Sequence, residues 1–359
     1  MASFPSNLFR ANILDNLQYI SSQESLFHTE DQDIIHFDKN ENPFDEVFTY
    51  NRNPEEFQEK FRSTFCTYYD VLPSQIVLNR SASDHLLRIL LLTTLNEVSS
   101  IVFVGPTPPE YMKMAELAGV HHYNSVGNDP FVIDNVFVNN IQSQQEPSVI
   151  VLSSPNHYTG QALRTDIIKE ICENNSKAIV IVDESLFEYT DAISAISLLE
   201  EVGNLIVLRS FSHFWGMAGV GISLAISHID FTEVLQSVTS PYVIDTQSLS
   251  YIQHIADTFR KSRTVFHTKT AIVTERERLT SFFESLSIVI KVYPSDTNFL
   301  LISFHKDSEE LYNQLLEEKI VVHFCKESTL RNLNCLRITV GTPVDNTVLI
   351  DVFTSISKL

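Results

Sequence analysis

The chain has 359 residues, 43% of them hydrophobic and 19% charged, a composition typical of a globular protein with more than one domain. Its 45 acidic and 25 basic residues give a formal net charge of −20. Such a surface repels phosphate backbones and anionic lipids, so we expect neither a nucleic-acid partner nor a membrane partner.

The cysteines and the first residues of the chain predict a cytoplasmic protein. There are four cysteines without CxxC spacing, which favours free thiols over disulfides or a structural zinc site. The first twenty residues contain no sustained apolar stretch, so we expect no signal peptide. The most apolar run, residues 86–95, contains Arg88 and is about half the length of a membrane span.

The first two thirds of the chain read as an α/β domain. Residues 1–33 are expected to form an N-terminal arm, and residues 34–245 alternate β-branched runs with helical patterns. This alternation is typical of a mainly parallel sheet with crossover helices. The strand-like runs lie at 101–104, 148–152, 178–182, 205–208 and 221–226, and the helices are expected at 84–95, 109–118 and 165–174, the first with Ser83 as N-cap.

The last third predicts a connecting helix and a smaller α+β domain. A long helical pattern covers residues 246–287, and residues 288–359 mix strand-like runs with two further helices. The strand-like runs lie at 288–293, 298–302, 320–324 and 335–340, and the helices at 308–319 and from residue 344 onward. The predicted fold class is therefore α/β, with a mainly parallel central sheet flanked by helices and a smaller α+β C-terminal domain.

Polar residues follow the predicted parallel strands, where open sheets of this kind bind their ligands. These segments are residues 105–111, 153–160, 183–185 and 209–216. Asp183 closes a fully apolar strand, and a carboxylate there is costly unless it meets a cation or a metal. A helix N-cap or a structural salt bridge would also explain Asp183.

These segments, taken in order, resemble the fold-type-I aminotransferases, and most closely the histidinol-phosphate aminotransferase group. The motifs are Asp38-Lys-Asn-Glu-Asn-Pro-Phe, Tyr50 with Pro54, Pro106-Thr-x-x-x-Tyr111, Pro155-Asn-x-x-Thr159-Gly160, Asp183-Glu184, Arg209-Ser-Phe-Ser-His-Phe-Trp-Gly-Met-Ala-Gly, Asn298-Phe299 and Leu336-Arg337-Ile-Thr-Val-Gly. Each motif alone is weak, but eight in collinear order cover nearly the whole chain. The resemblance implies aminotransferase fold type I.

That family binds pyridoxal phosphate as a Schiff base to a lysine in a Ser-Lys step, which here is Ser212-His213. An imidazole cannot form the aldimine, and no lysine occurs between Lys177 and Lys261. Other family contacts are replaced as well. Pro108 stands for the stacking aromatic, His157 for the asparagine at the ring hydroxyl, Leu186 for a tyrosine there, Gly221 for the phosphate-clamping arginine and Ser81 for the glycine opening the phosphate loop.

Several contacts that the resemblance implies are retained. Asp183 matches the carboxylate that pairs with the pyridinium nitrogen, and Arg337 matches the arginine that holds a substrate carboxylate. The further cofactor residues are Ser81, Ala82, His157, Ser210, Ser212 and Tyr50, the last reaching the partner subunit's phosphate. Tyr111 and Asn298 complete the expected substrate residues. The family builds each site from two subunits, which implies a homodimer.

The sequence leaves several functions open. In the first, a diverged protein acts on a small amino-acid-like carboxylate without ordinary transamination, using His213 as acid–base residue and Asp183 as its orienting partner. In the second, pyridoxal or pyridoxamine phosphate is held without a covalent link and His213 is the base. In the third, the chain is a non-catalytic binding or dimer-partner subunit. A fourth interpretation has His157, Asp183 and His213 binding a metal ion.

Overall fold

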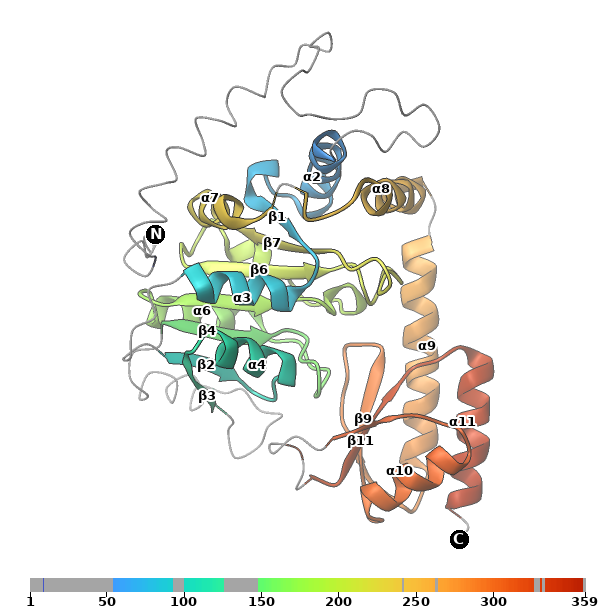
Figure 1. Ribbon diagram of the computed structural model, residues 1–359. Helices are drawn as coiled ribbons and strands as arrows, with labels where there is room; N and C mark the ends of the chain where they lie inside the picture. Colours follow the sequence, from blue (N-terminus) through green and yellow to red (C-terminus); the bar gives the residue numbers. More distant parts are fainter. Residues whose placement is uncertain are drawn as a thin grey trace.

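The computed structural model describes residue 9 and residues 54–92, 100–125, 148–240, 242–261, 264–325, 330 and 333–357. A large domain surrounds a seven-stranded sheet, and a small domain surrounds a four-stranded sheet (Figure 1). Helix α9 (Thr264–Glu284) runs from the one toward the other. None of the helices in these ranges is long and apolar enough to span a membrane.

The large sheet has the strand order β1-β7-β6-β5-β4-β2-β3. Only β7 runs antiparallel to its neighbours, so the predicted mainly parallel sheet is confirmed. The strands are β1 (Ile76–Asn79), β7 (Ser223–Ser227), β6 (Leu205–Ser210), β5 (Ile179–Asp183), β4 (Val149–Ser153), β2 (Ser100–Val104) and β3 (His121–Ser125). Ser153 pairs with Asp183, so the carboxyl ends of β4 and β5 lie level.

Helices cover both faces of the large sheet, which explains why its strands are apolar throughout. Alternate residues of each strand point to opposite faces, so Val180 and Val182 join one core while Ile179 and Ile181 join the other. The first core packs against α2 (Glu55–Tyr69), α6 (Thr165–Asn174) and α8 (Thr246–Lys261). The second packs against α3 (Ala82–Leu92), α4 (Pro109–Leu117) and α7 (Ile229–Val238).

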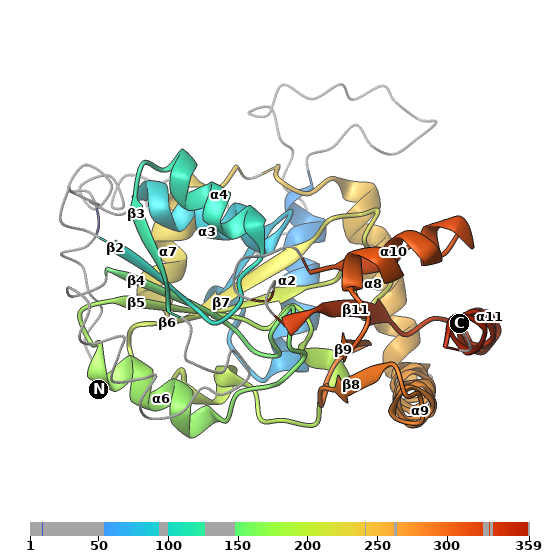
Figure 2. The same ribbon diagram turned by 90° about the horizontal axis from the view of Figure 1, so that it is seen from below.

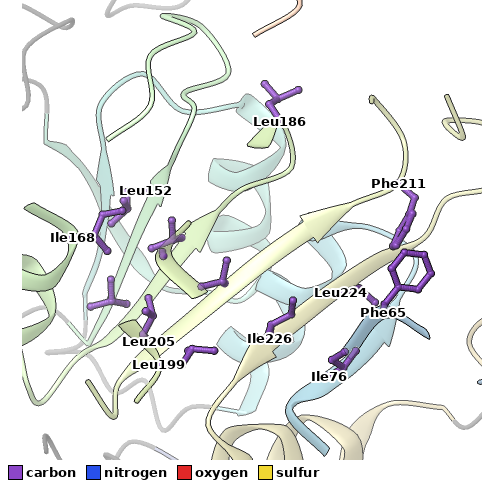
Figure 3. Packing of buried hydrophobic residues seen from close by; sticks show 14 of the residues in the cluster. Phe65, Ile76, Leu152, Ile168, Leu186, Leu199, Leu205, Phe211, Leu224 and Ile226 are labelled. Carbon is purple, nitrogen blue, oxygen red and sulfur yellow. The ribbon is translucent and has the colours of Figure 1, made fainter. Parts of the chain in front are cut away.

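Aromatic rings close the first core at one edge of the sheet. Phe65 of α2 lies against Phe211, which follows β6, with ring centroids 4.7 Å apart in a T-shaped contact (Figure 3). Trp215 is buried beside both rings. Full burial of each aromatic side chain contributes roughly 2–3 kcal/mol, so this contact anchors the segment that carries His213.

The small domain is an antiparallel sheet backed by helices, in the order β10-β11-β9-β8 (Figure 2). Its elements are β8 (Val289–Val292), β9 (Phe299–Phe304), α10 (Ser308–Glu317), β10 (His323–Phe324), β11 (Cys335–Thr339) and α11 (Pro343–Ile356). Phe283 of α9 and Phe353 of α11 pack edge to face in its core, at 4.9 Å. The predicted α+β composition is confirmed.

Two expectations need correction. Ser81, and not Ser83, caps α3, because its Oγ accepts the backbone N–H of Asp84 at 3.1 Å, the bond that an N-cap makes to the third helical residue. The predicted connecting helix over residues 246–287 consists of the separate helices α8 and α9. The arm predicted for residues 1–33 lies almost wholly outside the described residues, and the domain boundaries stay a prediction.

Candidate functional site

A cavity of about 510 Å³ lies at the carboxyl edge of the large sheet, where the small domain meets it. The segments after β4, β5 and β6 and the start of α3 supply one wall, and β10 and β11 supply the other. The lining residues are Ser81, Ala82, Ser83, Pro108, Pro109, Glu110, Tyr111, His157, Tyr158, Ser185, Ser210, Ser212, His213, His323 and Arg337. The edge that the sequence predicted for a ligand therefore does carry a cavity.

Asp183, the last residue of β5, is fully buried and accepts four hydrogen bonds. Its Oδ2 accepts from the Tyr111 hydroxyl at 2.6 Å and from His157 Nε2 at 2.7 Å. Its Oδ1 accepts from the backbone N–H of Ser185 at 2.9 Å and from the Ser185 hydroxyl at 2.5 Å. Burial alone raises the pKa of Asp183, but the nearby imidazole and these donors outweigh it and hold the pKa well below its usual range.

The phenol of Tyr111 shows the opposite effect. Burial, followed by the neighbouring charge of Asp183, raises the pKa of Tyr111 well above its usual value. The hydroxyl therefore stays protonated near neutral pH and keeps donating to the carboxylate. Tyr111 was expected among the substrate residues, and the structure places it as a donor to Asp183 at the cavity wall.

His157 is linked to both domains. Its ring is bound to Asp183 of the large domain, and its backbone carbonyl accepts from Arg337 Nη1 at 2.5 Å. Arg337 belongs to β11 of the small domain, and its guanidinium lies over the rings of Tyr158 and Phe299, 5.5 and 5.2 Å from their centroids. The described contacts of this cation are thus uncharged, which leaves its charge available to an anionic ligand.

His213 lies in the segment after β6, and its ring stands open to the cavity. Its centroid is 6.5 Å from that of His157. Partial withdrawal from water lowers the pKa of His213, as do His157 and Arg337, while Asp183 acts in the opposite direction. His213 is therefore neutral near pH 7 and can accept a proton.

The N-terminus of α3 and four serine hydroxyls form the far end of the cavity. Ser81 Oγ and Ser83 Oγ lie 3.0 Å apart, and the backbone N–H of Ser212 donates to Ser210 Oγ at 3.2 Å. A helix N-terminus favours negative charge. Because Ser81 Oγ already accepts the backbone N–H of Asp84, the serine hydroxyls are the donors that this part of the cavity offers to a ligand. This end of the cavity suits an anionic group.

The structure assembles most, but not all, of the predicted site. Ser81, Ala82, Tyr111, His157, Ser210, Ser212, His213 and Arg337 line the cavity, with Asp183 directly behind it. Asn298 is not among the lining residues, and its carbonyl accepts from the backbone of Val340. Tyr50 lies outside the described residues. The expectation that Asp183 orients His213 is wrong, because its described hydrogen bonds go to His157, Tyr111 and Ser185.

Two residues of the site were missed from the sequence. Ser185 donates twice to Asp183, and a small polar residue two positions after an aspartate is a recognisable turn signal. His323 lines the cavity because β10 pairs with β11, where it lies opposite Arg337. No local pattern predicts that pairing. Among the residues that the structure describes, no group of three His, Cys, Asp or Glu side chains is arranged to hold a metal ion, so the suggested metal site lacks support.

A buried ion-pair network holds the chain that follows Asp183. Arg209 of β6 contacts Glu184 at 2.7 Å and Glu188 at 3.0 Å, and it donates to the hydroxyl of Ser194 at 2.8 Å. Its guanidinium also lies 4.3 Å from the ring centroid of Phe187. In the sequence Arg209 is only part of a motif. In the structure its contacts hold residues 184–194 in place behind the cavity.

Fold and site together define the class of proteins with aminotransferase fold type I. The chain matches the family model "Aminotransferase class I and II" over residues 48–353, and it belongs to that family. It is 27% identical to the histidinol-phosphate aminotransferase of Flavobacterium psychrophilum over 352 residues, 97% of each chain. It is 33% identical to that of Thermoanaerobacter pseudethanolicus over 306 residues, covering 84% of this chain and 83% of that relative.

Solved structures show the same fold. The histidinol-phosphate aminotransferase from Clostridium acetobutylicum superposes with a TM-score of 0.75 at 18% identity, over 99% of this chain and 96% of that one. The enzyme of that name from Sinorhizobium meliloti, in complex with pyridoxal-5′-phosphate, gives a TM-score of 0.74 at 14% identity, over 98% and 89%.

Proposed function

We propose that this chain is a diverged member of its family that binds a small amino-acid-like carboxylate and does not carry out ordinary transamination. The sequence of residues 209–219 carries the proposal, because its resemblance to the family's cofactor-lysine segment puts His213 in the place of the Schiff-base lysine. The residues that line the cavity in the described part of the chain include no lysine that could replace it. Without a primary amine at this wall, the aldehyde of the family's cofactor has no attachment point.

A second observation argues against the usual seating of that cofactor. Bound pyridoxal phosphate supplies an electron sink, and a carboxylate at its ring nitrogen supports that chemistry. Here both oxygens of Asp183 are already engaged by His157, Tyr111 and Ser185. Gly221 adds no charge at the phosphate end, where the family has an arginine. The residues present do not fit the cofactor in the family's manner.

The proposed roles follow from position and charge. Arg337 holds the ligand's carboxylate from the small domain, because its described partners carry no compensating charge. His213 accepts or returns a proton, because its lowered pKa keeps it neutral near pH 7. The start of α3, with Ser81 and Ser83, receives any anionic group at the other end of the ligand.

The names of the relatives suggest one probe. They are called histidinol-phosphate aminotransferases, and the phosphate of histidinol phosphate is an anionic group that suits the one cationic side chain among the described lining residues, Arg337. We propose further that the chain is a homodimer in which Tyr50 of one subunit reaches the other's site. Light scattering that finds a monomer at micromolar concentration would remove that role for Tyr50.

A second candidate retains the cofactor without a covalent bond, with His213 as base. The anion-binding end formed by α3, Ser81 and Ser83 favours it, since a phosphate group fits there. Pyridoxamine phosphate needs no lysine and is the form that such a site would hold.

Titration of the purified protein separates the two candidates. Pyridoxal phosphate and pyridoxamine phosphate are added separately and followed by absorbance, by thermal shift and, after borohydride reduction, by intact mass. The first proposal predicts neither a spectral change nor a reduced adduct, together with thermal stabilisation by L-alanine or histidinol phosphate. Stabilisation by pyridoxamine phosphate supports the second candidate, and a borohydride-trapped adduct on the wild-type chain contradicts both.

A further inference from the structure

Two side chains that the resemblance assigns to a cofactor ring contact each other in this structure. His157 takes the place of the asparagine that meets the ring hydroxyl, and Asp183 the place of the carboxylate that meets the ring nitrogen. Nε2 of His157 lies 2.7 Å from Oδ2 of Asp183, a direct hydrogen bond. The imidazole therefore makes the contact that the ring nitrogen would otherwise make.

We propose that His157, held by Asp183, occupies the position that the pyridine ring of the cofactor takes in the family. Its other ring nitrogen then faces a small anionic ligand, which binds in the cavity without a cofactor. His157 is thus the residue that sets the specificity of the cavity, in addition to the change at His213. The inference rests on the proposed function and assigns a cause to the loss of the cofactor that is separate from the missing lysine.

The carboxylate cannot serve a cofactor and His157 at once. An ionised aspartate offers about four acceptor positions, and the described donors fill them: His157 and Tyr111 at Oδ2, and Ser185 twice at Oδ1. A pyridine ring would have to displace the imidazole from a fully buried charge. Hydrogen bonds to buried charges are the strong ones, so this displacement opposes cofactor binding.

The same bond decides which nitrogen of His157 faces the ligand. A buried ionised carboxylate only accepts hydrogen bonds, so Nε2 of His157 must carry a proton. Nδ1 is then the nitrogen left to bind the ligand. Asp183 thereby acts as the orienting partner of an acid–base histidine, but that histidine is His157 and not His213.

The loop that carries His157 is held firmly enough to keep this geometry. Asn156 donates to the carbonyl of Pro106 at 2.9 Å and accepts the backbone N–H groups of Tyr158 and Thr159 at 2.9 and 3.1 Å. Arg337 bonds to the carbonyl of His157 from the small domain. Asp183 therefore fixes the imidazole ring. The Asn156 side chain fixes the backbone on either side of His157, and Arg337 binds its carbonyl.

The cavity beside His157 has polar and charged lining groups that suit a small anionic ligand. Arg337 offers a cation to the cavity, and Ser81, Ser83, Ser210 and Ser212 offer hydroxyl groups. The rings of His157 and His213 line the same cavity, with centroids 6.5 Å apart. Both imidazoles belong to the large-domain wall, after β4 and β6, so a molecule whose anionic group is held by Arg337 on the other wall faces both of them. No redox partner is required for proton exchange with either.

Rebuilding the cofactor seat in two steps tests the inference. His213→Lys restores the amine, and His213→Lys with His157→Asn restores the ring seat as well. We expect the double variant to bind pyridoxal phosphate, measured by the absorbance of its imine, on the order of tenfold to a hundredfold more tightly than His213→Lys alone. The matched control combines His213→Lys with His228→Asn, which changes an exposed histidine outside the cavity and keeps a capping side chain at the start of α7, and it should bind within about twofold of His213→Lys.

The outcomes separate this inference from the proposed function. Equal affinity of His213→Lys and both double variants overturns the role of His157 while leaving the proposed function intact. An imine on the wild-type protein overturns the proposed function itself.

A measurement on the wild-type chain decides the matter if the double variant does not fold. In ¹⁵N-histidine NMR of the full chain, with the His157 signals assigned from His157→Gln, we expect the neutral ring to carry its proton on Nε2 and a lone pair on Nδ1. Asp183→Asn should abolish that tautomer preference. A wild-type His157 with its proton on Nδ1 at high pH would refute the pair.

Discussion

Arg337 of the small domain donates its Nη1 to the backbone carbonyl of His157 in the large domain, at 2.5 Å. The segment after β4 and strand β11, far apart in the sequence, thus bring the guanidinium of Arg337 to the backbone of a residue whose imidazole is bound to a carboxylate. The hydrogen bond ties the backbone of His157 to the side chain of Arg337. The two residues that connect the domains here are therefore also lining residues of the cavity.

Removing the charge of Arg337 should abolish ligand binding at modest cost to the fold. Arg337→Gln keeps a donor for the His157 carbonyl, so the free energy of unfolding should fall by only about 1 kcal/mol. The thermal shift produced by L-alanine or histidinol phosphate in the wild-type protein should disappear. Arg164→Gln, which removes an exposed arginine outside the cavity, should bind both probes as the wild type does. Binding that survives Arg337→Gln would exclude Arg337 as the anion site.

Breaking the buried network of Arg209 should be strongly destabilising. Arg209→Met leaves Glu184 and Glu188 without their cation, and burial raises the pKa of Glu184 even with Arg209 present. We expect a loss of about 3–5 kcal/mol in urea unfolding. Lys169→Gln, which removes an exposed ion pair to Glu201, should change the same quantity by less than about 1 kcal/mol. If the two variants lost similar free energies of unfolding, the buried network of Arg209 would not be a major source of stability.

The buried His85 should make the protein sensitive to mild acid. Burial lowers the pKa of His85 to about 3, although its bond to the backbone of Ser223 acts in the opposite direction. The unfolded chain takes up a proton below about pH 6.5 while the folded chain does not, so stability falls as the pH drops from about 6.5 toward 3. Between pH 7 and pH 5 this residue should cost about 2 kcal/mol.

His85→Gln isolates that effect. The wild type and the variant are unfolded in urea at pH 7 and at pH 5, and the change in free energy between the two pH values is compared. The variant should lose about 2 kcal/mol less than the wild type, because glutamine does not titrate. Identical pH dependence would mean that His85 is protonated in the folded protein.

The cysteines should differ sharply in reactivity. Burial raises the pKa of Cys172 and of Cys335 to about 12, and Cys325 is buried as well, whereas Cys66 of α2 is half-buried. Because the thiolate is the reactive form, a thiol reagent should label Cys66 first in the native protein and all four in urea. Mass spectrometry counts the labels, and Cys66→Ser should leave the native chain nearly unlabelled. Rapid native labelling of Cys172 would contradict its burial.

Local patterns were enough for much of the fold. Residues 165–174 were predicted as a helix and form one with those bounds, because amphipathic spacing is a local property. The strand ending at Asp183 was also recognised, since four apolar residues buried on both faces precede it. The cap of α3 was misplaced by two residues, because Ser81 and Ser83 carry the same chemistry and only the backbone geometry distinguishes them.

From the sequence alone follow the fold type, the edge of the sheet that carries the cavity, and the absence of a lysine from the segment around His213. Each depends on residue type and order along the chain. Only the tertiary structure decided that Asp183 bonds to His157 and not to His213, that Arg337 approaches from the small domain, and that Arg209 is neutralised behind the cavity. These are contacts between residues 21 to 180 positions apart, and at such separations the packing of strands and domains, not local spacing, determines which side chains meet.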